Sequence, residues 1–387
     1  MPVLSRIASY ADELTEIRRD LHQHPEIGFQ EFRTAKVVTE KLKQWGIDQV
    51  FTGLATTGVV GVVKGRSESG RSVGLRADMD ALPMDEQTTL LFASKSPGVF
   101  HGCGHDGHTT MLLGAARYLA ETRNFSGRVI LIFQPAEEGL GGAQAMLESG
   151  LFERFSCNEI YGLHNDPMAK MNKVTIKPGA AMAGATFFDI VVTGKGSHAA
   201  QPHNARDPII VATALVQSLQ SVISRNIRPT ETAVLSVTQI HSGTAYNVVP
   251  DRASIAGTIR YFSENAYEKV HERVSKICTG FSQSYEVDIS FNFRKVFDVL
   301  INDPELSQTY LDAATEIVGS ENTSLVDEVS TGSEDFADML KVVPGSYLRL
   351  GHGSNIPLHN PGFILSDEIL PIGAAILARI AEKRLPL

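Results

Sequence analysis

The run Arg128-Val-Ile-Leu-Ile-Phe133 decides the fold class, because its apolar residues follow one another without polar alternation. Such runs are typical of strands that are covered on both faces of a sheet. Two similar runs precede it at residues 58–63 and 72–76, and a helical segment at 109–121 lies between the second run and the third. Strands that alternate with helices predict an α/β fold with a mixed, mainly parallel sheet flanked by helices.

A different order of elements occupies residues 184–294, after a joint rich in glycine, alanine and methionine. The sequence predicts strand, helix, strand, strand, helix and strand, at residues 187–193, 208–224, 233–241, 253–261, 264–281 and 286–293. This is the ferredoxin-like α+β order, which forms one antiparallel sheet with two helices on one face. After residue 302 the alternation resumes and ends in an amphipathic helix at 367–383. We therefore expect an α/β domain formed by residues 1–183 and 295–387, with the ferredoxin-like unit inserted at 184–294.

Composition excludes several classes of protein. The 387 residues are 43% hydrophobic and 20% charged, which is typical of a globular chain and not of a disordered one. The formal charge is −9, and Lys and Arg are scattered singly, so we expect no nucleic-acid partner and no membrane partner. No apolar window approaches the ~18 residues of a transmembrane helix, and the N-terminal segment lacks the apolar core of a signal peptide. With only three cysteines, too few for a disulfide scaffold, we expect a cytoplasmic protein.

Residues that can bind a metal are concentrated in a few short segments. They are Asp78 and Asp80, Cys103 and His105, Glu137 and Glu138, His164, and His359. Most of these segments follow expected strands, whose carboxyl ends line one crevice of an α/β sheet. Thiolate, imidazole and carboxylate together bind borderline metals such as zinc, manganese, cobalt or nickel. Taken singly, each acid could be a turn residue or a helix N-cap, and each histidine a structural residue.

The Cys103-Gly-His105 segment and the adjacent Glu137 and Glu138 favour a catalytic site over a structural one. No further cysteine lies near Cys103 to close a structural zinc site, so the set predicts an open metal site. In a turn, one of two neighbouring carboxylates can bind the metal while the other faces an activated water. Metal and carboxylate then supply the polarised carbonyl, the water and the general base that amide hydrolysis requires.

Five motifs of this sequence resemble those of the M20 metallopeptidases. They are Arg76-Ala-Asp-Met-Asp-Ala-Leu-Pro, His101-Gly-Cys-Gly-His-Asp-Gly-His, Gln134-Pro-Ala-Glu-Glu-Gly, Gly196-Ser-His-Ala-Ala-Gln-Pro-His and Tyr246-Asn-Val-Val-Pro-Asp. More narrowly, they resemble the amidohydrolase branch that includes hippurate hydrolases, N-acyl-amino-acid hydrolases and plant auxin-conjugate hydrolases. The resemblance extends from Arg18 to His359, and it implies a zinc-exopeptidase-like catalytic domain with a lid and dimerisation domain at 184–294.

The resemblance also implies a site with two divalent metal ions bridged by a water. It gives the metal ligands as Cys103, His105, Glu138, His164 and His359. Glu137 matches the general base, and Asp80 matches the acid that orients a metal-bound imidazole, with Asp78 as the alternative for that role. In many M20 relatives a histidine stands in the place of Asp78 and an aspartate bridges the metals; this chain departs from that pattern, and Cys103 with His105 fits the amidohydrolase variant.

Three residues of the inserted unit match further positions of the family. His198 matches a histidine that reaches the active site of the partner subunit and stabilises the oxyanion; the alternative is a histidine that hydrogen-bonds a strand end. Asn247 and Arg260 match residues that contact the substrate carboxylate, which the planar guanidinium of arginine binds bidentately. Arg260 could instead pair with a surface acid. We therefore expect a homodimer, with a tetramer as the alternative.

These observations predict a metal-dependent amidohydrolase that cleaves the amide bond of N-acyl amino acids such as acetyl, benzoyl or indoleacetyl conjugates. A dipeptidase or carboxypeptidase of the same family is the alternative. A serine or cysteine hydrolase is a second class of hypothesis, because Cys103 lies near histidines, but a thiolate metal ligand explains that cysteine better. A binding protein that has lost catalysis is the third, and the complete ligand set with Glu137 argues against it. The acyl group, the amino acid and the metal stay open.

Overall fold

The computed structural model describes residues 3–387, which form two compact units. Within those residues the first unit runs to Gly179 and also contains Ile301–Glu328 and Asp335–Leu387. The second unit consists of Ala180–Leu300 and Val329–Glu334. Each unit has a hydrophobic core of its own. Among the described residues we find no helix with the length and apolar character that crossing a membrane requires.

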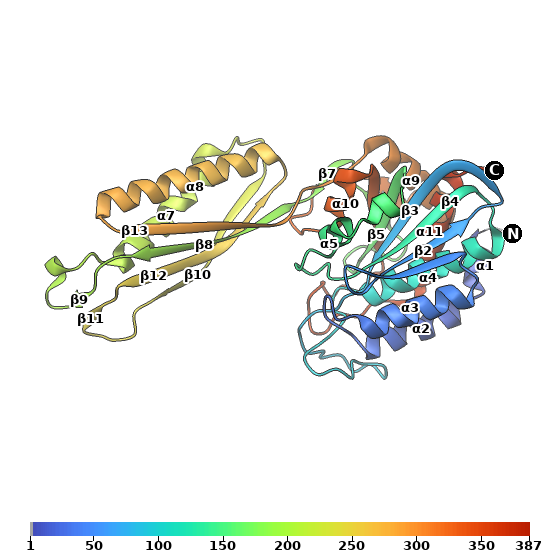
Figure 1. The fold of residues 1–387 in the computed structure, drawn as a ribbon, viewed down its shortest axis with the longest axis horizontal. Helices are drawn as coiled ribbons and strands as arrows, with labels where there is room; N and C mark the ends of the chain where they lie inside the picture. The colour runs from blue at the N-terminus through green and yellow to red at the C-terminus, as the bar shows by residue number, and fades with distance from the viewer. Residues whose placement is uncertain (1–2) are drawn as a thin grey trace. The chain divides into compact units, whose positions relative to one another are not determined.

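The first unit is built on a mixed eight-stranded sheet (Figure 1). In spatial order its strands are β1 (Gln49–Leu54), β2 (Gly58–Lys64), β4 (Ser126–Gln134), β3 (Ser67–Asp78), β5 (Glu159–Asp166), β16 (Gly345–Gly351), β6 (Val174–Ile176) and β15 (Thr323–Leu325). The central strands β4, β3, β5 and β16 are parallel, whereas β2 and β6 pair antiparallel on either side of them. The carboxyl ends of the four central strands therefore lie at one edge, where a ligand crevice is expected.

Helices flank this sheet, as the alternating pattern of the sequence predicts. They are α1 (Val3–Ala8), α2 (Ala11–Gln23), α3 (Phe32–Gln44), α4 (His105–Thr122), α5 (Gly142–Glu148), α6 (Leu151–Arg154), α9 (Pro304–Val318), α10 (Phe336–Val342) and α11 (Leu370–Arg384), with 3-10 turns at Ser320–Asn322 and Asp367–Ile369. Helix α4 packs against β3 and α11, and α11 packs against α9. The predicted mixed α/β architecture is confirmed.

The second unit has the predicted ferredoxin-like arrangement. Its elements are β8 (Gly184–Thr193), α7 (Pro208–Asn226), β10 (Ala233–Ser242), β12 (Arg252–Tyr261), α8 (Glu264–Tyr285) and β13 (Asp288–Phe297), with short segments β9 (Ser197–His198), Pro202–Asn204 and β11 (Val248–Val249). The sheet order is β10-β12-β8-β13, and every pairing is antiparallel. The chain enters the second unit within β7 (Gly179–Met182) and leaves it within β14 (Leu300–Asn302), and it returns to that unit for Val329–Glu334.

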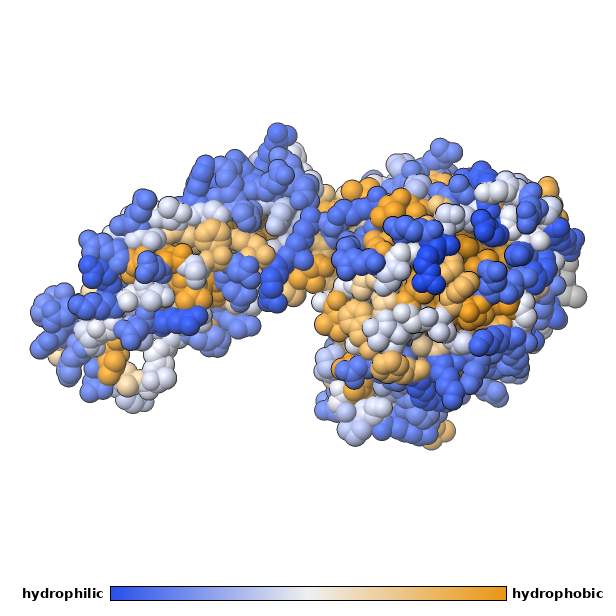
Figure 2. All heavy atoms as spheres, in the orientation of Figure 1, coloured by the Kyte–Doolittle hydropathy of each residue, from blue (hydrophilic) through white to orange (hydrophobic). Residues whose placement is uncertain are grey.

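Local chemistry explains where the helices of the second unit begin. Asp207 accepts a hydrogen bond from the amide of Ile209, and Pro208 occupies the first turn of α7. The hydroxyl of Ser263 accepts from the amide of Ala266 at the start of α8. Both helices pack their apolar sides on the sheet, and hydrophobic residues also gather at the surface of this unit in Figure 2.

Two expected helices differ from the observed ones. Helix α4 begins at His105 and not at 109, so the ligand-rich segment forms its first turn. The C-terminal helix, expected to be amphipathic, is buried on nearly all sides because α4 and α9 pack against it.

Candidate metal centre

Cys103 and His105 reach the site from the start of α4. The intervening Gly104 has φ +91°, and a Cβ there would lie 2.5 Å from Nδ2 of Asn165. Glycine fits here because it has no Cβ to clash with Asn165 and because it adopts positive φ readily. Asn165 donates a hydrogen bond of 2.6 Å from Nδ2 to the carbonyl of Cys103. The start of α4 is thereby fixed against the end of β5.

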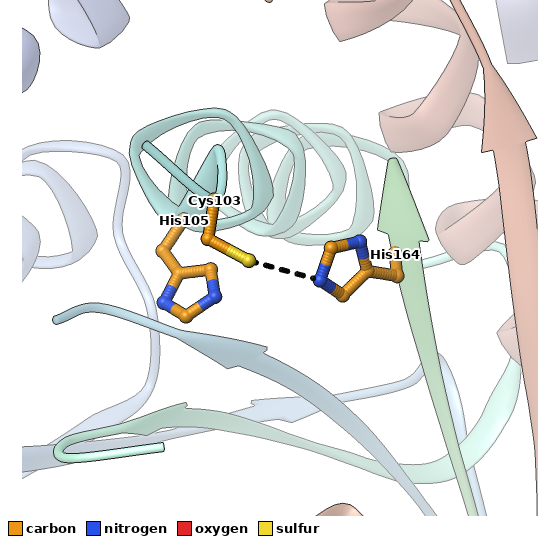
Figure 3. Close-up of side chains that lie close together, drawn as sticks. All are labelled: Cys103, His105 and His164. Atoms are coloured by element: carbon orange, nitrogen blue, oxygen red, sulfur yellow. Dashed lines mark hydrogen bonds between the residues drawn. The ribbon is translucent and has the colours of Figure 1, made fainter. Parts of the chain in front are cut away.

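His164 reaches the same place from β5, the neighbouring element (Figure 3). Its Nε2 lies 3.5 Å from Sγ of Cys103, and its Nδ1 lies 2.7 Å from the carbonyl oxygen of Asn165. A hydrogen bond from Nδ1 to that carbonyl leaves a lone pair on Nε2, directed at the cluster. This is the state in which histidine binds a metal.

Glu137, Glu138 and His359 complete the cluster from two loops. Glu137 and Glu138 lie in the loop that follows β4. The amide of Glu138 donates to Oδ2 of Asp80 at 3.0 Å. Oε1 of Glu138 lies 3.2 Å from Nε2 of His359 and 3.9 Å from Nε2 of His105. His359 adopts φ +61°, and its amide donates to the carbonyl of Gly102.

The predicted ligands form one connected cluster in the first unit. Ligand atoms within 4.8 Å of one another occur in three overlapping sets: Cys103, His105 and His164; Cys103, Glu138 and His359; and His105, Glu137 and Glu138. The structure thus brings together all five sequence-predicted ligands and the predicted base. They come from four segments that are far apart in the chain.

The residues present fit a divalent metal. Nε2 of His105 is buried without a hydrogen-bond partner, 3.9 Å from the buried Oε1 of Glu138, which has Nε2 of His359 at 3.2 Å but no hydrogen bond of good geometry. Unsatisfied buried nitrogen and oxygen atoms are rare and costly in folded proteins. Here they face each other in a cluster that also contains a thiol and two more imidazoles, the donor set of borderline divalent cations.

The pKa values of the clustered side chains also indicate a site suited to a cation. Burial alone would lower the pKa of His105, but Asp78, Cys103 and Asp80 raise it well above its usual value. The pKa of His359 rises to about 10, because Cys103 and Glu138 lie against its ring. Burial and the Glu138 carboxylate raise the pKa of the Cys103 thiol. Protons therefore supply the positive charge that a bound cation would supply in their place.

The two aspartates after β3 have different partners. Oδ1 of Asp80 lies 3.2 Å from Nδ1 of His105, on the ring nitrogen that faces away from the cluster. Asp78 instead pairs with Nη1 of Arg76 at 2.8 Å and with Nδ1 of His108 at 2.7 Å. The geometry thus favours Asp80 over Asp78 as the residue that orients His105.

Sequence reasoning missed the buried residues that surround this cluster and hold its neighbours by hydrogen bonds. Arg76 bridges Asp78 and Asp335, and Gln134 donates to both oxygens of Asp335. His108 Nε2 accepts from the amide of Asn165. The spacing of His105 and His108 on one helix face could have indicated His108. Nothing in the sequence around Asp335 points to its partners.

The three predicted residues of the second unit lie on its strands and loops. His198 on β9 is paired in register with Val248 of β11, and the amide of Ala199 donates to the carbonyl of Asn247. His198 and Asn247 are thus neighbours, and both are exposed. Arg260 on β12 donates from Nη1 to Oγ of Ser333 at 2.7 Å, and burial lowers the pKa of its guanidinium.

A serine nucleophile finds no support in the first unit. The segment Gly70-Arg-Ser-Val-Gly74 has the Gly-x-Ser-x-Gly spacing of a nucleophile elbow. Ser72, however, lies within β3, and its hydroxyl donates to the carbonyl of Ser156. It is buried in a sheet and not exposed on a strand-to-helix turn.

An α/β sheet with a Cys, His and Glu cluster at its strand ends, together with a ferredoxin-like unit, defines a hydrolase of the metallopeptidase class. Comparison with known families agrees: the family described as peptidase family M20/M25/M40 matches residues 74–383, and the chain belongs to this family. It is a hydrolase that acts on amide bonds, and it falls in the amidohydrolase branch.

Similar proteins align over almost the whole chain. A hippurate hydrolase of Campylobacter jejuni is 40% identical over all of both chains. A thermostable carboxypeptidase of Saccharolobus solfataricus is 37% identical over 96% of this chain and 95% of its own. Among solved structures, a dinuclear metal-binding peptidase of the M20 family from Bacillus subtilis is 34% identical, covers 98% of this chain and 99% of its own, and has a TM-score of 0.84.

Proposed function

We propose that this protein is a metal-dependent amidohydrolase that cleaves N-acyl amino acids to a carboxylic acid and a free amino acid. The observation that carries the proposal is the cluster of five metal-ligand side chains with Glu137 beside it. The similarity to a hippurate hydrolase over the full length of both chains supports this substrate class, because hippurate is an N-acyl amino acid.

Two divalent ions, of zinc, manganese, cobalt or nickel, would be held by the cluster. The ligands would be Cys103, His105, Glu138, His164 and His359, and a dinuclear site in a structural relative supports the number of ions. Bound there, such ions polarise an amide carbonyl and lower the pKa of a water molecule.

Glu137 is the proposed general base. It is buried beside Glu138, and its Oε1 lies 3.4 Å from the amide nitrogen of Asp335. A carboxylate in this position can take a proton from the attacking water and deliver it to the leaving amine. Asp80 has the supporting role of holding the His105 ring in one orientation.

The second unit is proposed to act as a lid and as a dimerisation domain. Its sheet ends in two edge strands, β10 and β13, and Val234 and Ile240 of β10 are exposed. Unpaired apolar edges are covered when two copies associate. His198 would then stabilise the oxyanion in the partner subunit, and Asn247 and Arg260 would bind the substrate carboxylate. We propose a homodimer, with a tetramer as the alternative.

A carboxypeptidase acting on small peptides is the second candidate, and the Saccharolobus relative favours it. A hydrolysis panel separates the two functions. Purified protein, stripped with a chelator and reloaded with each of the four metals, is given acetyl, benzoyl and indoleacetyl amino acids and unblocked dipeptides. Higher kcat/KM on the acylated compounds, and none without metal, is expected. Preference for the unblocked peptides would contradict the amidohydrolase proposal, and full activity of stripped protein would contradict both.

A further inference from the structure

The turn that carries Glu137 has a strained backbone. Ala136, directly before Glu137, adopts φ +54°, a left-handed conformation that costs a residue with a Cβ on the order of 1 kcal/mol. Ala136 is also fully buried. Such a conformation persists only where surrounding contacts hold it.

Two buried carboxylates hold the amides on either side of Glu137. Oε1 of Glu31 accepts a 2.8 Å hydrogen bond from the amide of Ala136. Oδ2 of Asp80 accepts one of 3.0 Å from the amide of Glu138. Charged acceptors make the stronger class of hydrogen bond. The two contacts therefore fix the 135–136 peptide before the strained Ala136 and the 137–138 peptide after Glu137.

The loop that carries Glu31 also supports the turn by direct contact. A Cβ on Gly28 would lie 2.9 Å from both Cα and Cβ of Ala136. The backbone of this loop is therefore in van der Waals contact with the strained residue. Segment 28–31 meets the turn twice, once by packing and once by a hydrogen bond.

The side chain of Glu31 binds the turn and Thr57 and not the helix that follows it. It is the N-cap residue of α3, yet its side chain makes no capping hydrogen bond. Its second oxygen accepts from Oγ1 of Thr57 at 2.6 Å. The carboxylate is completely buried, and no Lys or Arg of the described residues forms an ion pair with it. Burial raises its pKa, and the Thr57 hydrogen bond opposes that rise.

We propose that Glu31 is a positioning residue, whose hydrogen bond to the amide of Ala136 keeps the Glu137 carboxylate in its catalytic orientation. The inference rests on the proposed role of Glu137 as general base. The hydrogen bonds of the Glu31 side chain go to Thr57 and Ala136 and to none of the five proposed ligands. Its loss would lower kcat, with metal content and KM unchanged.

Two conservative variants separate hydrogen bonding from charge. Glu31→Gln keeps an oxygen that can accept from Ala136, and its amide can donate to Thr57. Glu31→Asp keeps the charge, but its shorter side chain cannot reach the amide. We expect Gln to retain kcat within about 2-fold and Asp to lose about 3- to 10-fold, the rate equivalent of one hydrogen bond. Thr57→Val is the matched control, because it removes the other partner of Glu31 and leaves the Ala136 contact; its kcat should stay near that of the wild type.

Replacement of the strained residue gives a second readout. Glycine adopts positive φ without cost, so the turn should depend less on Glu31 in an Ala136→Gly background. Glu31→Asp is therefore expected to lower kcat less in that background than in the wild type. A purely structural role of Glu31 would give the same loss in both.

The outcomes separate the two proposals. Loss of kcat in Glu31→Gln with normal activity in Glu31→Asp would overturn the positioning role, as would equal kcat in both or a parallel loss of bound metal. If Glu137→Gln is itself fully active, the proposed base is wrong. If Glu137→Gln is inactive while Glu31→Asp is normal, only the role of Glu31 fails.

Discussion

His22 is a buried histidine that lies outside the proposed metal-ligand set and faces two acidic side chains, Asp106 and Glu86. Its Nδ1 lies 2.8 Å from Oδ2 of Asp106, and both side chains are buried. Burial alone would lower the pKa of His22, but Asp106 and Glu86 outweigh it and raise the pKa to about 9. The protonated imidazole is thus favoured by the fold.

The raised pKa predicts a pH-dependent contribution to stability. Because the pKa of His22 is higher in the folded than in the unfolded state, its contribution is complete below about pH 6.5 and is lost as pH rises through about 9. Its size is on the order of 3 kcal/mol. Thermal unfolding of wild type and His22→Gln should therefore differ most at pH 6 and converge at pH 10. The exposed His203→Gln is the control, and a pH-independent gap for His22→Gln would contradict the assignment.

The candidate ligands could be found at the residue scale because thiol, imidazole and carboxylate groups occur together in short segments of the sequence. Glu138 follows β4, whereas Cys103 and His105 lie at the start of α4. The set of five ligands itself followed from the resemblance to the M20 family. Glu31 and Asp335 were not predictable. Each is one acid among many, and its partner lies far away in the chain, as the 105-residue separation of Glu31 from Ala136 illustrates.

At the scale of elements, periodicity predicted the strands and helices well and their boundaries less well. The apolar run at 128–133 is the centre of β4, and all six elements of the ferredoxin-like order are present. Helix α4 begins earlier than predicted because its first turn contains His105, Asp106 and His108, whose polarity hides the helical period. These polar residues are nevertheless buried, because each has a polar partner inside the fold: His105 pairs with Asp80, Asp106 with His22 and His108 with Asp78.

Helix α11 was predicted at the right place, but its burial was not predicted. An amphipathic pattern, as expected for this segment, predicts a helix with one exposed face. In the fold, the charged residues of α11 pair with neighbouring elements, as Arg384 does with Glu159 and Arg379 with Glu316. A sequence records which side chains are charged, but the partners that allow their burial depend on tertiary packing.

At the scale of the whole molecule, the proposed dimer predicts complementation between two inactive variants. His198→Ala removes the proposed oxyanion donor, and Glu137→Gln removes the proposed base. In the proposed dimer these two groups come from different subunits and act in the same site. A mixture that exchanges subunits should regain part of the wild-type activity, because a heterodimer contains one complete site. Glu137→Gln mixed with Glu138→Gln is the matched control; both defects lie in the same metal centre, so no activity should return. Heterodimers verified by mass spectrometry that remain inactive would exclude a role of His198 across the interface.

The proposed function depends most directly on Glu137 as the base and on Glu138, with the other four proposed ligands, as the residues that hold the metals. The most direct test is to measure kcat and bound metal together for Glu137→Gln, with Glu138→Gln as the paired variant, on the best N-acyl amino acid. We predict that Glu137→Gln keeps its metal and loses at least ~10²-fold in kcat, whereas Glu138→Gln loses metal. A Glu137→Gln enzyme with wild-type kcat, or one that has lost its metal, would contradict the account.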